Sequence, residues 1–170
     1  MLRSRGLRMT NNDVLRMVRY ALELHNPAVL ELFALSNIQL QLVDLDAMLR
    51  NDDDAGYVAM SDRLLAAMLD GLVVKHRGKR EAGPANPRQA RAPQAALTNN
   101  RILRALRIAL ELKDTDVLHI LEKGGLVVSK AALAALFRRE AHRNYQPCGD
   151  QILRYFLRGL GIWYRGARNP

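Results

Sequence analysis

The fold is decided by a stretch that this sequence contains twice: TNNDVLRMVRYALEL at residues 10–24 and TNNRILRALRIALEL at residues 98–112. The similarity extends well beyond this stretch. Residues 10–78, slid forward by 88 positions, align with residues 98–166 without a gap, and about a third of the aligned positions are identical. Internal duplication means that one structural unit is built twice. We therefore predict two similar repeats.

Both copies of the stretch have the spacing of an amphipathic helix. One apolar stripe consists of Val14, Leu15, Val18, Ala21 and Leu22, and the second consists of Ile102, Leu103, Leu106, Ala109 and Leu110. Thr10 and Thr98 precede the stripes and are typical helix caps. Asp13 completes a capping box after Thr10, whereas Arg101 weakens the box in the second copy.

Three further helices are predicted in each copy. The apolar spacing predicts them over 27–35 and 115–123, then around 45–49 and after a cap at Ser129, and finally from Asp62 and Asp150 onward. Strand alternation is hard to find, and residues 38–42 are the best short candidate. The sequence therefore predicts an all-α protein of two four-helix repeats, packed through their apolar faces in a pseudo-twofold arrangement.

The residues outside the repeats divide into an arm, a linker and a tail. Residues 1–9 are basic and lack the apolar core of a secretory signal, so we expect a disordered arm or a translation start at Met9. Residues 79–97 hold three of the six prolines and almost no large apolar side chain, which is typical of a flexible linker. Residues 167–170 form the tail. The predicted domains are residues 10–78 and 98–166.

The two repeats differ in charge. The whole chain has a formal net charge of +9. Residues 10–78 contain 6 basic and 10 acidic side chains, a net charge of −4, while residues 98–166 contain 12 and 6, a net charge of +6. This asymmetry indicates either that the halves attract each other or that the second repeat binds a polyanion.

The composition fits a soluble cytoplasmic protein. With 170 residues, the chain can bury a core without disulfides or metals. Cys148 is the one cysteine, so an internal disulfide cannot form, and a reducing compartment is compatible with the sequence. No apolar run reaches the length of about 18 residues that a spanning helix needs. We expect no membrane association.

Recognisable enzyme and metal motifs are missing from the sequence. It has no glycine-rich phosphate loop, no paired His-Glu metal motif and no Cys-x-x-Cys. None of the four histidines recurs at its aligned position, so we predict neither a metal site nor a cofactor. Residues 52–54 are three aspartates without the glycine and terminal glutamate of a calcium loop, and we interpret them as a solvated turn.

Two features of the sequence are compatible with catalysis, a cysteine before a helix and a possible cleft between the repeats. Cys148 precedes a predicted helix whose positive end could activate a thiol, although its aligned partner Met60 favours a small buried apolar role. A cleft between the repeats could also gather catalytic side chains that the sequence cannot place together, namely Tyr57, Tyr145, Asp62 and Asp150. We assign no catalytic residues and expect a protein that is not an enzyme.

The arginines of the second repeat are the most informative functional feature. Arg154, Arg158 and Arg165 are spaced 4 and 7 residues apart, which places them within about 40° of one another on one helix face. Guanidinium groups beside aromatic rings can hold a phosphate backbone and stack on bases. The alternative is a solvated or partner-facing surface with the aromatic rings in the core. The candidate nucleic-acid-binding residues are Arg101, Arg104, Arg107, Arg138, Arg139, Arg143, Arg154, Arg158, Arg165, Tyr155, Trp163 and Tyr164.

A helix-turn-helix motif fits the second repeat loosely. Residues 117–121, the Gly124-Gly125 pair and a helix capped by Ser129 have the right order of parts. The turn is too long, however, and Arg138 and Arg139 lie at the C-terminal end of the presumed recognition helix, whereas base contacts come from its N-terminal part.

The block CGDQILRYFLRGL at residues 148–160 carries a resemblance to a known family. Together with residues 99–107 and 11–20, it is similar to the YehS-like bacterial proteins, which contain a duplicated domain of unknown function. The resemblance covers residues 10–166. It implies a cytoplasmic helical protein of two repeats and supplies no catalytic residues. This chain departs from the family in the arginine-bearing extension before Met9 and in a linker rich in Pro, Ala and Arg.

These observations favour a non-enzymatic binding protein. We expect the second repeat and the linker to engage nucleic acid, RNA in preference to duplex DNA, through phosphate contacts. The competing hypothesis is a protein-interaction adaptor in which one repeat docks on an acidic protein partner or on a second copy of the chain as a homodimer.

Overall fold

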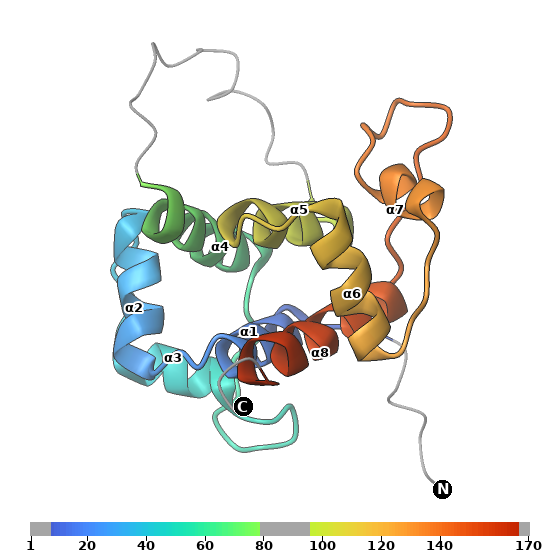
Figure 1. Ribbon diagram of the computed structural model, residues 1–170. Coiled ribbons are helices and arrows are strands. Elements are labelled where there is room, and N and C mark those ends of the chain that lie inside the picture. The colour runs from blue at the N-terminus through green and yellow to red at the C-terminus, as the bar shows by residue number, and fades with distance from the viewer. Residues whose placement is uncertain (1–7, 79–95, 167–170) are drawn as a thin grey trace, which may run out of the picture.

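The computed structural model describes residues 8–78 and 96–166, and within these residues the regular structure is entirely helical (Figure 1). Residues 38–41 are a loop, and Leu42 begins a helix, so the weak strand candidate at 38–42 was wrong. Repeat 1 contains α1 (Asn11–Ala21), α2 (Asn26–Leu35), α3 (Leu42–Leu49) and α4 (Asp62–Arg77), and repeat 2 contains α5 (Asn99–Ala109), α6 (Asp114–Gly124), α7 (Lys130–Leu136) and α8 (Asp150–Gly166). The predicted all-α fold of two four-helix repeats is confirmed.

The two repeats are interleaved rather than placed side by side. Within each repeat the second helix packs on the fourth, so α2 lies against α4 and α6 against α8. Between the repeats, α1 packs on α8 and α5 packs on α4. Figure 1 shows the α4–α5 pair along one side of the molecule and the α1–α8 pair along the other, with α2 and α6 at the two ends. Each pair therefore takes one helix from each repeat.

A glycine at the same place in both repeats allows the second and fourth helices to touch. A Cβ on Gly71 would lie 1.9 Å from the carbonyl oxygen of Leu32, and a Cβ on Gly159 would lie 1.7 Å from the carbonyl oxygen of Ile120. No side chain fits at these distances, since the two helix backbones are in direct contact. The shared glycine thus fixes the α2–α4 and α6–α8 packing.

A buried asparagine in each repeat holds the long loop that precedes the fourth helix. The Asn12 side chain donates to the carbonyl oxygens of Met48 and Val58, at 2.8 and 2.9 Å, and accepts from the amide of Met60 at 2.9 Å. Asn100 donates in the same way to Leu136 and Gln146, at 2.9 Å each, and accepts from Cys148 at 2.8 Å. The amide group of each asparagine is therefore satisfied although the side chain is buried.

The first residues before α1 and α5 belong to the folded body. The amide of Met9 donates to Asp150 at 2.9 Å, and the amide of Leu97 donates to Asp62 at 3.3 Å. The side chains of Met9 and Leu97 also pack against the core. Met9 and Leu97, which the sequence placed in the arm and the linker, thus join one repeat to the other. The rest of the predicted arm, linker and tail, residues 1–7, 79–95 and 167–170, lies outside the described residues.

These contacts also give Asp62 and Asp150 structural roles. Besides the cross-repeat bond, each carboxylate accepts from an asparagine of its own repeat, Asn11 at 2.8 Å for Asp62 and Asn99 at 2.7 Å for Asp150. The two carboxylates therefore anchor the beginnings of the repeats.

None of the helices in residues 8–78 and 96–166 combines the length and the apolar character that a membrane span requires.

Candidate functional site

Four of the predicted arginines surround one hollow in repeat 2. The hollow has a volume of about 360 Å³ and lies where the beginning of α5 faces the loop that follows α7. We call it the arginine hollow and define it by the residues that line it, Thr98, Asn100, Arg101, Arg104, Arg138, Arg139, Glu140 and Tyr145.

Backbone carbonyls hold two of these arginines in place. The guanidinium of Arg104 donates to the carbonyl oxygen of Phe137, and that of Arg138 donates to the carbonyl oxygen of Asn144 at 3.4 Å. Arg101 and Arg104 are three residues apart on α5, so their side chains share one helix face. The positive charges are thus brought together by α5 and by the loop after α7.

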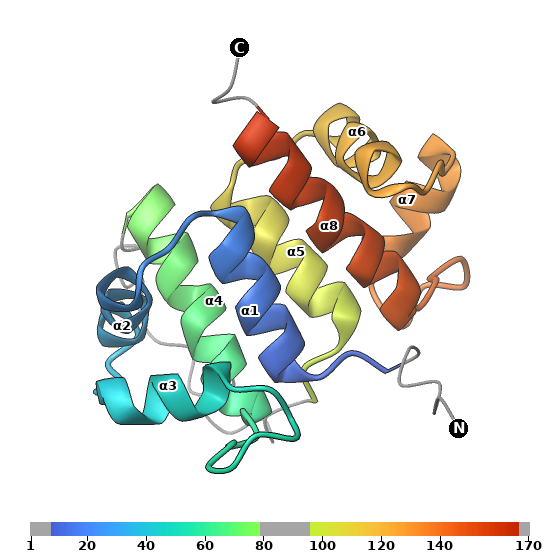
Figure 2. The ribbon, with the colours of Figure 1, turned by 90° about the horizontal axis from the view of Figure 1, so that it is seen from below.

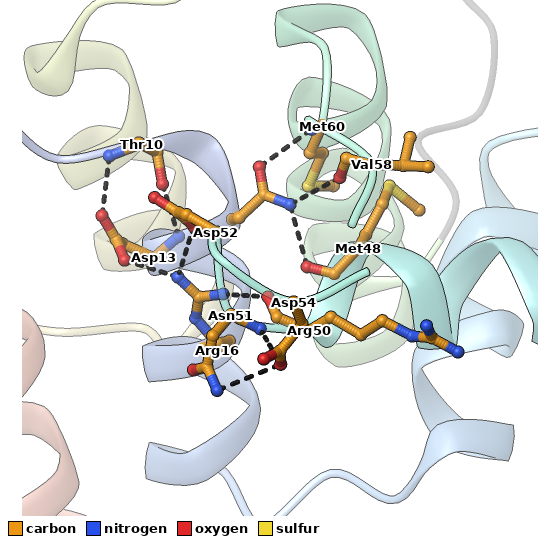
Figure 3. A network of polar contacts seen from close by, with 11 residues as sticks. Thr10, Asp13, Arg16, Met48, Arg50, Asn51, Asp52, Asp54, Val58 and Met60 are labelled. Atoms are coloured by element: carbon orange, nitrogen blue, oxygen red, sulfur yellow. Dashed lines mark hydrogen bonds and ion pairs between the residues drawn. The ribbon is translucent and has the colours of Figure 1, made fainter. Parts of the chain in front are cut away.

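The equivalent place in repeat 1 contains carboxylates that neutralise the arginine (Figure 3). Arg16, the counterpart of Arg104, lies 2.7 Å from an oxygen of Asp13 and 3.6 Å from an oxygen of Asp52. Its guanidinium also donates to the carbonyl oxygen of Arg50 at 2.6 Å. Arg50 itself donates to the carbonyl oxygen of Ala55. In repeat 1 the guanidinium of Arg16 is therefore surrounded by oxygen atoms of its own repeat.

Asp13 is held in its ionised form. Its carboxylate accepts from the Thr10 amide at 2.9 Å, and the Thr10 hydroxyl accepts from the Asp13 amide at 3.1 Å, which completes the predicted capping box. Partial burial by itself would raise the pKa of Asp13, but the hydrogen bonds of Thr10 and Arg16 and the charge of Arg16 outweigh it, so the pKa is lowered.

Repeat 2 has an arginine where repeat 1 has the carboxylate of Asp13. Arg101 occupies the position of Asp13, and Glu140 occupies that of Asp52. Thr98 keeps its cap and accepts from the Arg101 amide at 3.3 Å, but the reciprocal carboxylate is lost, as predicted. Glu140 is the one acidic residue among the side chains that line the hollow. Four arginines and one glutamate thus line the arginine hollow.

Two other predicted arginines are engaged by the protein itself. Arg107 lies 2.7 Å from Asp114, and its guanidinium stacks over the ring of Phe137 at 4.5 Å. Arg165 stacks over the ring of Tyr20 at 4.1 Å and lies 3.7 Å from Glu23, so it links α8 to repeat 1. These contacts give both arginines a structural role.

The remaining three predicted arginines do not line the arginine hollow. Arg154 and Arg158 lie on α8, where Arg154 donates to Gln151 at 3.3 Å and Arg158 is exposed. Arg143 is exposed in the loop before α8. Because α8 pairs with α1 while α5 pairs with α4, the arginine set is divided between two helix pairs (Figure 2). The predicted site is thus split rather than continuous.

The three predicted aromatic residues pack against the core. Tyr155, Trp163 and Tyr164 are each half-buried in contact with core side chains. The ring of Trp163 stacks on His119 with the ring centres 6.4 Å apart. Burial raises the pKa of Tyr164, and the charge of Asp116 adds to the rise. This placement agrees with the alternative that the rings belong to the core, and it removes them from the arginine hollow.

Cys148 and the helix-turn-helix candidate have structural explanations. Cys148 is only 6% exposed, and burial, followed by the charge of Asp150, raises its pKa to about 12, which keeps the thiol protonated and unreactive. Its predicted role as a small buried residue is confirmed.

Ser129 does cap α7, but this helix has only 7 residues, and Arg138 and Arg139 lie beyond its end. A recognition helix of that length presents little surface to a groove of DNA.

No cluster of three or more histidine, cysteine or acidic side chains suited to a metal ion occurs in the described part of the chain.

The sequence did not predict that Thr98, Tyr145 and Glu140 lie beside the arginines of the hollow. The signal that could have found them is the alignment of the repeats itself. It places Arg101 on Asp13 and Glu140 on Asp52, which marks the positions where the charge is reversed or kept.

Comparison with known proteins bears on the same two repeats. A family model described as a protein of unknown function (DUF1456) matches the chain twice, at residues 11–78 and 99–166. The chain belongs to the DUF1456 family. Both matches begin one residue after a capping threonine and end within one residue of the end of the fourth helix of a repeat, so the family domain coincides with one four-helix repeat.

A similar protein matches this chain over nearly its whole length. The chain is 40% identical over 152 residues to the uncharacterized protein YehS of Escherichia coli (strain K12), which covers 89% of this chain and 94% of that protein. No solved structure was found to match the chain. The predicted family and its duplication are confirmed.

Proposed function

We propose that this protein binds nucleic acid, RNA in preference to duplex DNA, as a non-enzymatic cytoplasmic protein, and that the arginine hollow holds the phosphate groups. The observation that carries the proposal is the replacement of Asp13 by Arg101 at a site that the two repeats otherwise share. Where repeat 1 supplies its own anion, repeat 2 supplies another cation.

The geometry of repeat 1 indicates what the missing group does. The carboxylate of Asp13 approaches the Arg16 guanidinium to 2.7 Å, a charge-assisted hydrogen bond. A phosphate group presents oxygen atoms to a guanidinium in a similar paired geometry. We infer that an external phosphate takes, beside Arg104, the place that Asp13 takes beside Arg16. The surrounding arginines, Arg101, Arg138 and Arg139, then neutralise its charge.

The shape of the site favours a flexible strand. The arginine hollow is recessed between α5 and a loop, and Tyr145 in its lining offers a hydroxyl and a ring beside the arginines. Proteins recognise single-stranded RNA by combining phosphate contacts with contacts to splayed bases and to the 2′-hydroxyl group. A recessed site of this kind suits an unpaired strand better than the regular backbone of a duplex.

The test is a titration of a labelled single-stranded RNA at salt concentrations from about 50 to 200 mM. We expect the affinity to fall steeply with salt, since each phosphate contact releases counterions. Arg101→Asp restores the acidic residue of repeat 1 and should weaken binding by about 10- to 100-fold, the loss of one or two charge-assisted contacts. Affinity that stays flat over this range of salt would sink the proposal.

Two further variants locate the effect. Lys123→Asp makes the same change of charge at an exposed position on α6, away from the arginine hollow, and should change affinity by no more than a few-fold. Arg154→Glu with Arg158→Glu tests the α8 arginines, which we expect to contribute less than the hollow. Equal losses in Arg101→Asp and Lys123→Asp, with a larger loss in the double variant, which changes the charge twice as much, would mean that net charge, and no particular site, governs binding.

The competing hypothesis, a protein-interaction adaptor, is tested by purifying the protein without nuclease. Protein purified without nuclease should carry nucleic acid, seen as a raised absorbance ratio, if the proposal holds. A preparation free of nucleic acid that elutes as a dimer would instead support docking on an acidic partner or on a second copy.

A further inference from the structure

The α4–α5 pair forms a groove that adjoins the arginine hollow. The groove has a volume of about 680 Å³, within the range of roughly 300–1,000 Å³ that is usual for ligand pockets. Its apolar lining comes from Val73 and Val74 of α4 and from Ala105 and Ile108 of α5. The groove therefore lies between the repeats, at one of the two places where a helix from each repeat packs together (Figure 1).

The groove and the arginine hollow share two lining residues. Arg101 and Arg104 line both of them. Ile108 is seven residues after Arg101 on the same helix, a distance of about 10 Å along the axis. This is the length scale of a single nucleotide, so a phosphate beside Arg101 and a base beside Ile108 can belong to one strand.

The pseudo-equivalent groove between α1 and α8 is covered by an aromatic side chain of the protein. Tyr20 occupies the position of Ile108, and Gly161 occupies that of Val73. The Tyr20 ring lies 3.6 Å from the point that a Cβ on Gly161 would occupy. Arg165 stacks over this ring at 4.1 Å and donates to the Tyr20 carbonyl oxygen at 3.3 Å. A flat ring and a guanidinium thus cover the α1–α8 groove.

The α4–α5 groove keeps the guanidinium and lacks the ring. Arg77 is the counterpart of Arg165 and also lines the groove, 3.9 Å from Glu111. Ile108 cannot stack beneath it as Tyr20 does beneath Arg165. Repeat 2 therefore lacks two groups that repeat 1 has on the same helix face, a carboxylate at position 101 and an aromatic ring at position 108. A nucleotide carries both kinds of group, a phosphate and a flat aromatic base.

One acidic residue faces this apolar groove. Asp70 lines it together with Arg77, Arg101 and Arg104, and burial raises the pKa of Asp70. A carboxylate opposes a phosphate but accepts hydrogen bonds from N–H groups at the edge of a base. Guanine offers two adjacent N–H donors on its Watson–Crick edge, whereas uracil offers one. Asp70 therefore favours a guanine base in the groove.

The geometry points to a base-binding site: the α4–α5 groove accepts one unpaired base of a single-stranded RNA, guanine in preference to uracil, with Arg77 above the ring and Asp70 at its edge. This inference rests on the proposed function, since the phosphate of the same strand lies in the arginine hollow. The occupant is a nucleic-acid strand because the groove shares Arg101 and Arg104 with that hollow and is also lined by Arg77.

The test uses the full chain and two single-stranded RNA probes of equal length, oligouridylate and the same oligomer with one guanosine, beside a duplex RNA. Ile108→Tyr returns to repeat 2 the ring that repeat 1 already has, at a side chain that is 38% exposed and tolerant of change. It should weaken binding of the guanosine probe by about 10-fold, the value of one stacked base, and leave duplex binding unchanged. Val73→Gly combined with Ile108→Tyr copies the α1–α8 groove more fully and should give the larger loss.

Two more variants separate the base site from the phosphate site. Asp70→Asn should reduce the preference for guanosine over uridine, because an amide replaces one acceptor oxygen with a donor. Tyr20→Ile makes the reverse change in the α1–α8 groove and should leave all three affinities unchanged. Thermal melting checks that each variant is folded.

The outcomes distinguish the two proposals. If Ile108→Tyr and Asp70→Asn retain the wild-type preference for the guanosine probe while Arg101→Asp abolishes binding, the base site is wrong and the phosphate site stands. If no RNA binds the wild-type protein at physiological salt, both are wrong. Loss of the guanosine preference in the groove variants, with duplex binding intact, supports the base site.

Discussion

Repeat 1 and repeat 2 share one scaffold but treat the same arginine differently. In repeat 1, Arg16 lies against Asp13 and Asp52, so its charge is balanced inside the repeat. In repeat 2, Arg104 lies beside Arg101 in a hollow that two further arginines, Arg138 and Arg139, also line. The difference teaches that the duplication preserves the groups that hold the backbone together, whereas the charged groups around this arginine differ, with Asp13 in repeat 1 and Arg101 in repeat 2.

The largest effect should come from the shared glycines, where the repeats are expected to behave alike. Gly71→Ala and Gly159→Ala each place a Cβ within 2 Å of a carbonyl oxygen, so the helices must separate. We expect each variant to lose about 3 kcal/mol or more of unfolding free energy, measured by urea denaturation. Gly166→Ala is the control, because nothing lies within 4 Å of its Cβ. A glycine variant with wild-type stability would show that its helix pair is less tightly packed.

The buried asparagines should give the next largest effect. Asn12→Ala and Asn100→Ala each leave three backbone groups without their partner, and each should cost about 2–3 kcal/mol of unfolding free energy. Asn144→Ala, at an exposed position, should be nearly neutral. Chemical denaturation of the three variants provides the comparison. Unequal losses at the two buried sites would mean that the loops are held differently in the two repeats.

The pH dependence of stability should distinguish the repeats. Because hydrogen bonds lower the pKa of Asp13 in the folded protein, its contribution is fully present above its unfolded pKa and is lost as the pH falls through its folded pKa. Asp13→Asn should therefore cost about 0.5–1 kcal/mol near neutral pH and nothing in strong acid. Denaturation at a series of pH values measures this difference.

A matched change supplies the control for the acid effect. Glu122→Gln removes the same charge from an exposed position on α6 and should cost less stability than Asp13→Asn near neutral pH, with little dependence on pH. If the cost of Asp13→Asn persists in strong acid, then the amide disturbs the helix cap for a reason other than the lost charge.

The smallest effect should be the coupling between Tyr20 and Arg165. Their stacked contact joins repeat 1 to α8, and a double-mutant cycle with Tyr20→Ala and Arg165→Ala should give a coupling of about 0.5–1 kcal/mol. The matching cycle with Ile108→Ala and Arg77→Ala should give almost none, since no ring is present there. Equal couplings in the two cycles would remove the distinction between the grooves.

Much of the fold was predictable because it depends on local patterns. The apolar stripe from Val14 to Leu22 and the caps at Thr10, Thr98 and Ser129 specify helices through neighbouring residues alone. The pairing of α1 with α8 was not predictable, because it depends on contacts between residues more than a hundred positions apart, such as Arg165 with Tyr20.

The site was predictable in part for the same reason. Helical spacing correctly placed Arg154, Arg158 and Arg165 on one helix, but it could not show that Arg165 is engaged by Glu23 of the other repeat. The gathering of Arg101 and Arg104 with Arg138 required the path of the loop after α7. The rings of Trp163 and Tyr164 have a spacing that fits either a surface or a core, and only packing decides between the two.

The most direct measurement follows the arginine side-chain signals by NMR while single-stranded RNA is added to the wild-type protein. Both repeats are then observed in one molecule under one condition. We predict that the guanidinium signals of Arg101, Arg104, Arg138 and Arg139 shift with a common affinity, while those of Arg16 and Arg50 stay in place. Shifts of equal size at Arg16 and Arg50, or shifts confined to Arg154 and Arg158, would contradict the claim that the change from Asp13 to Arg101 created an anion site.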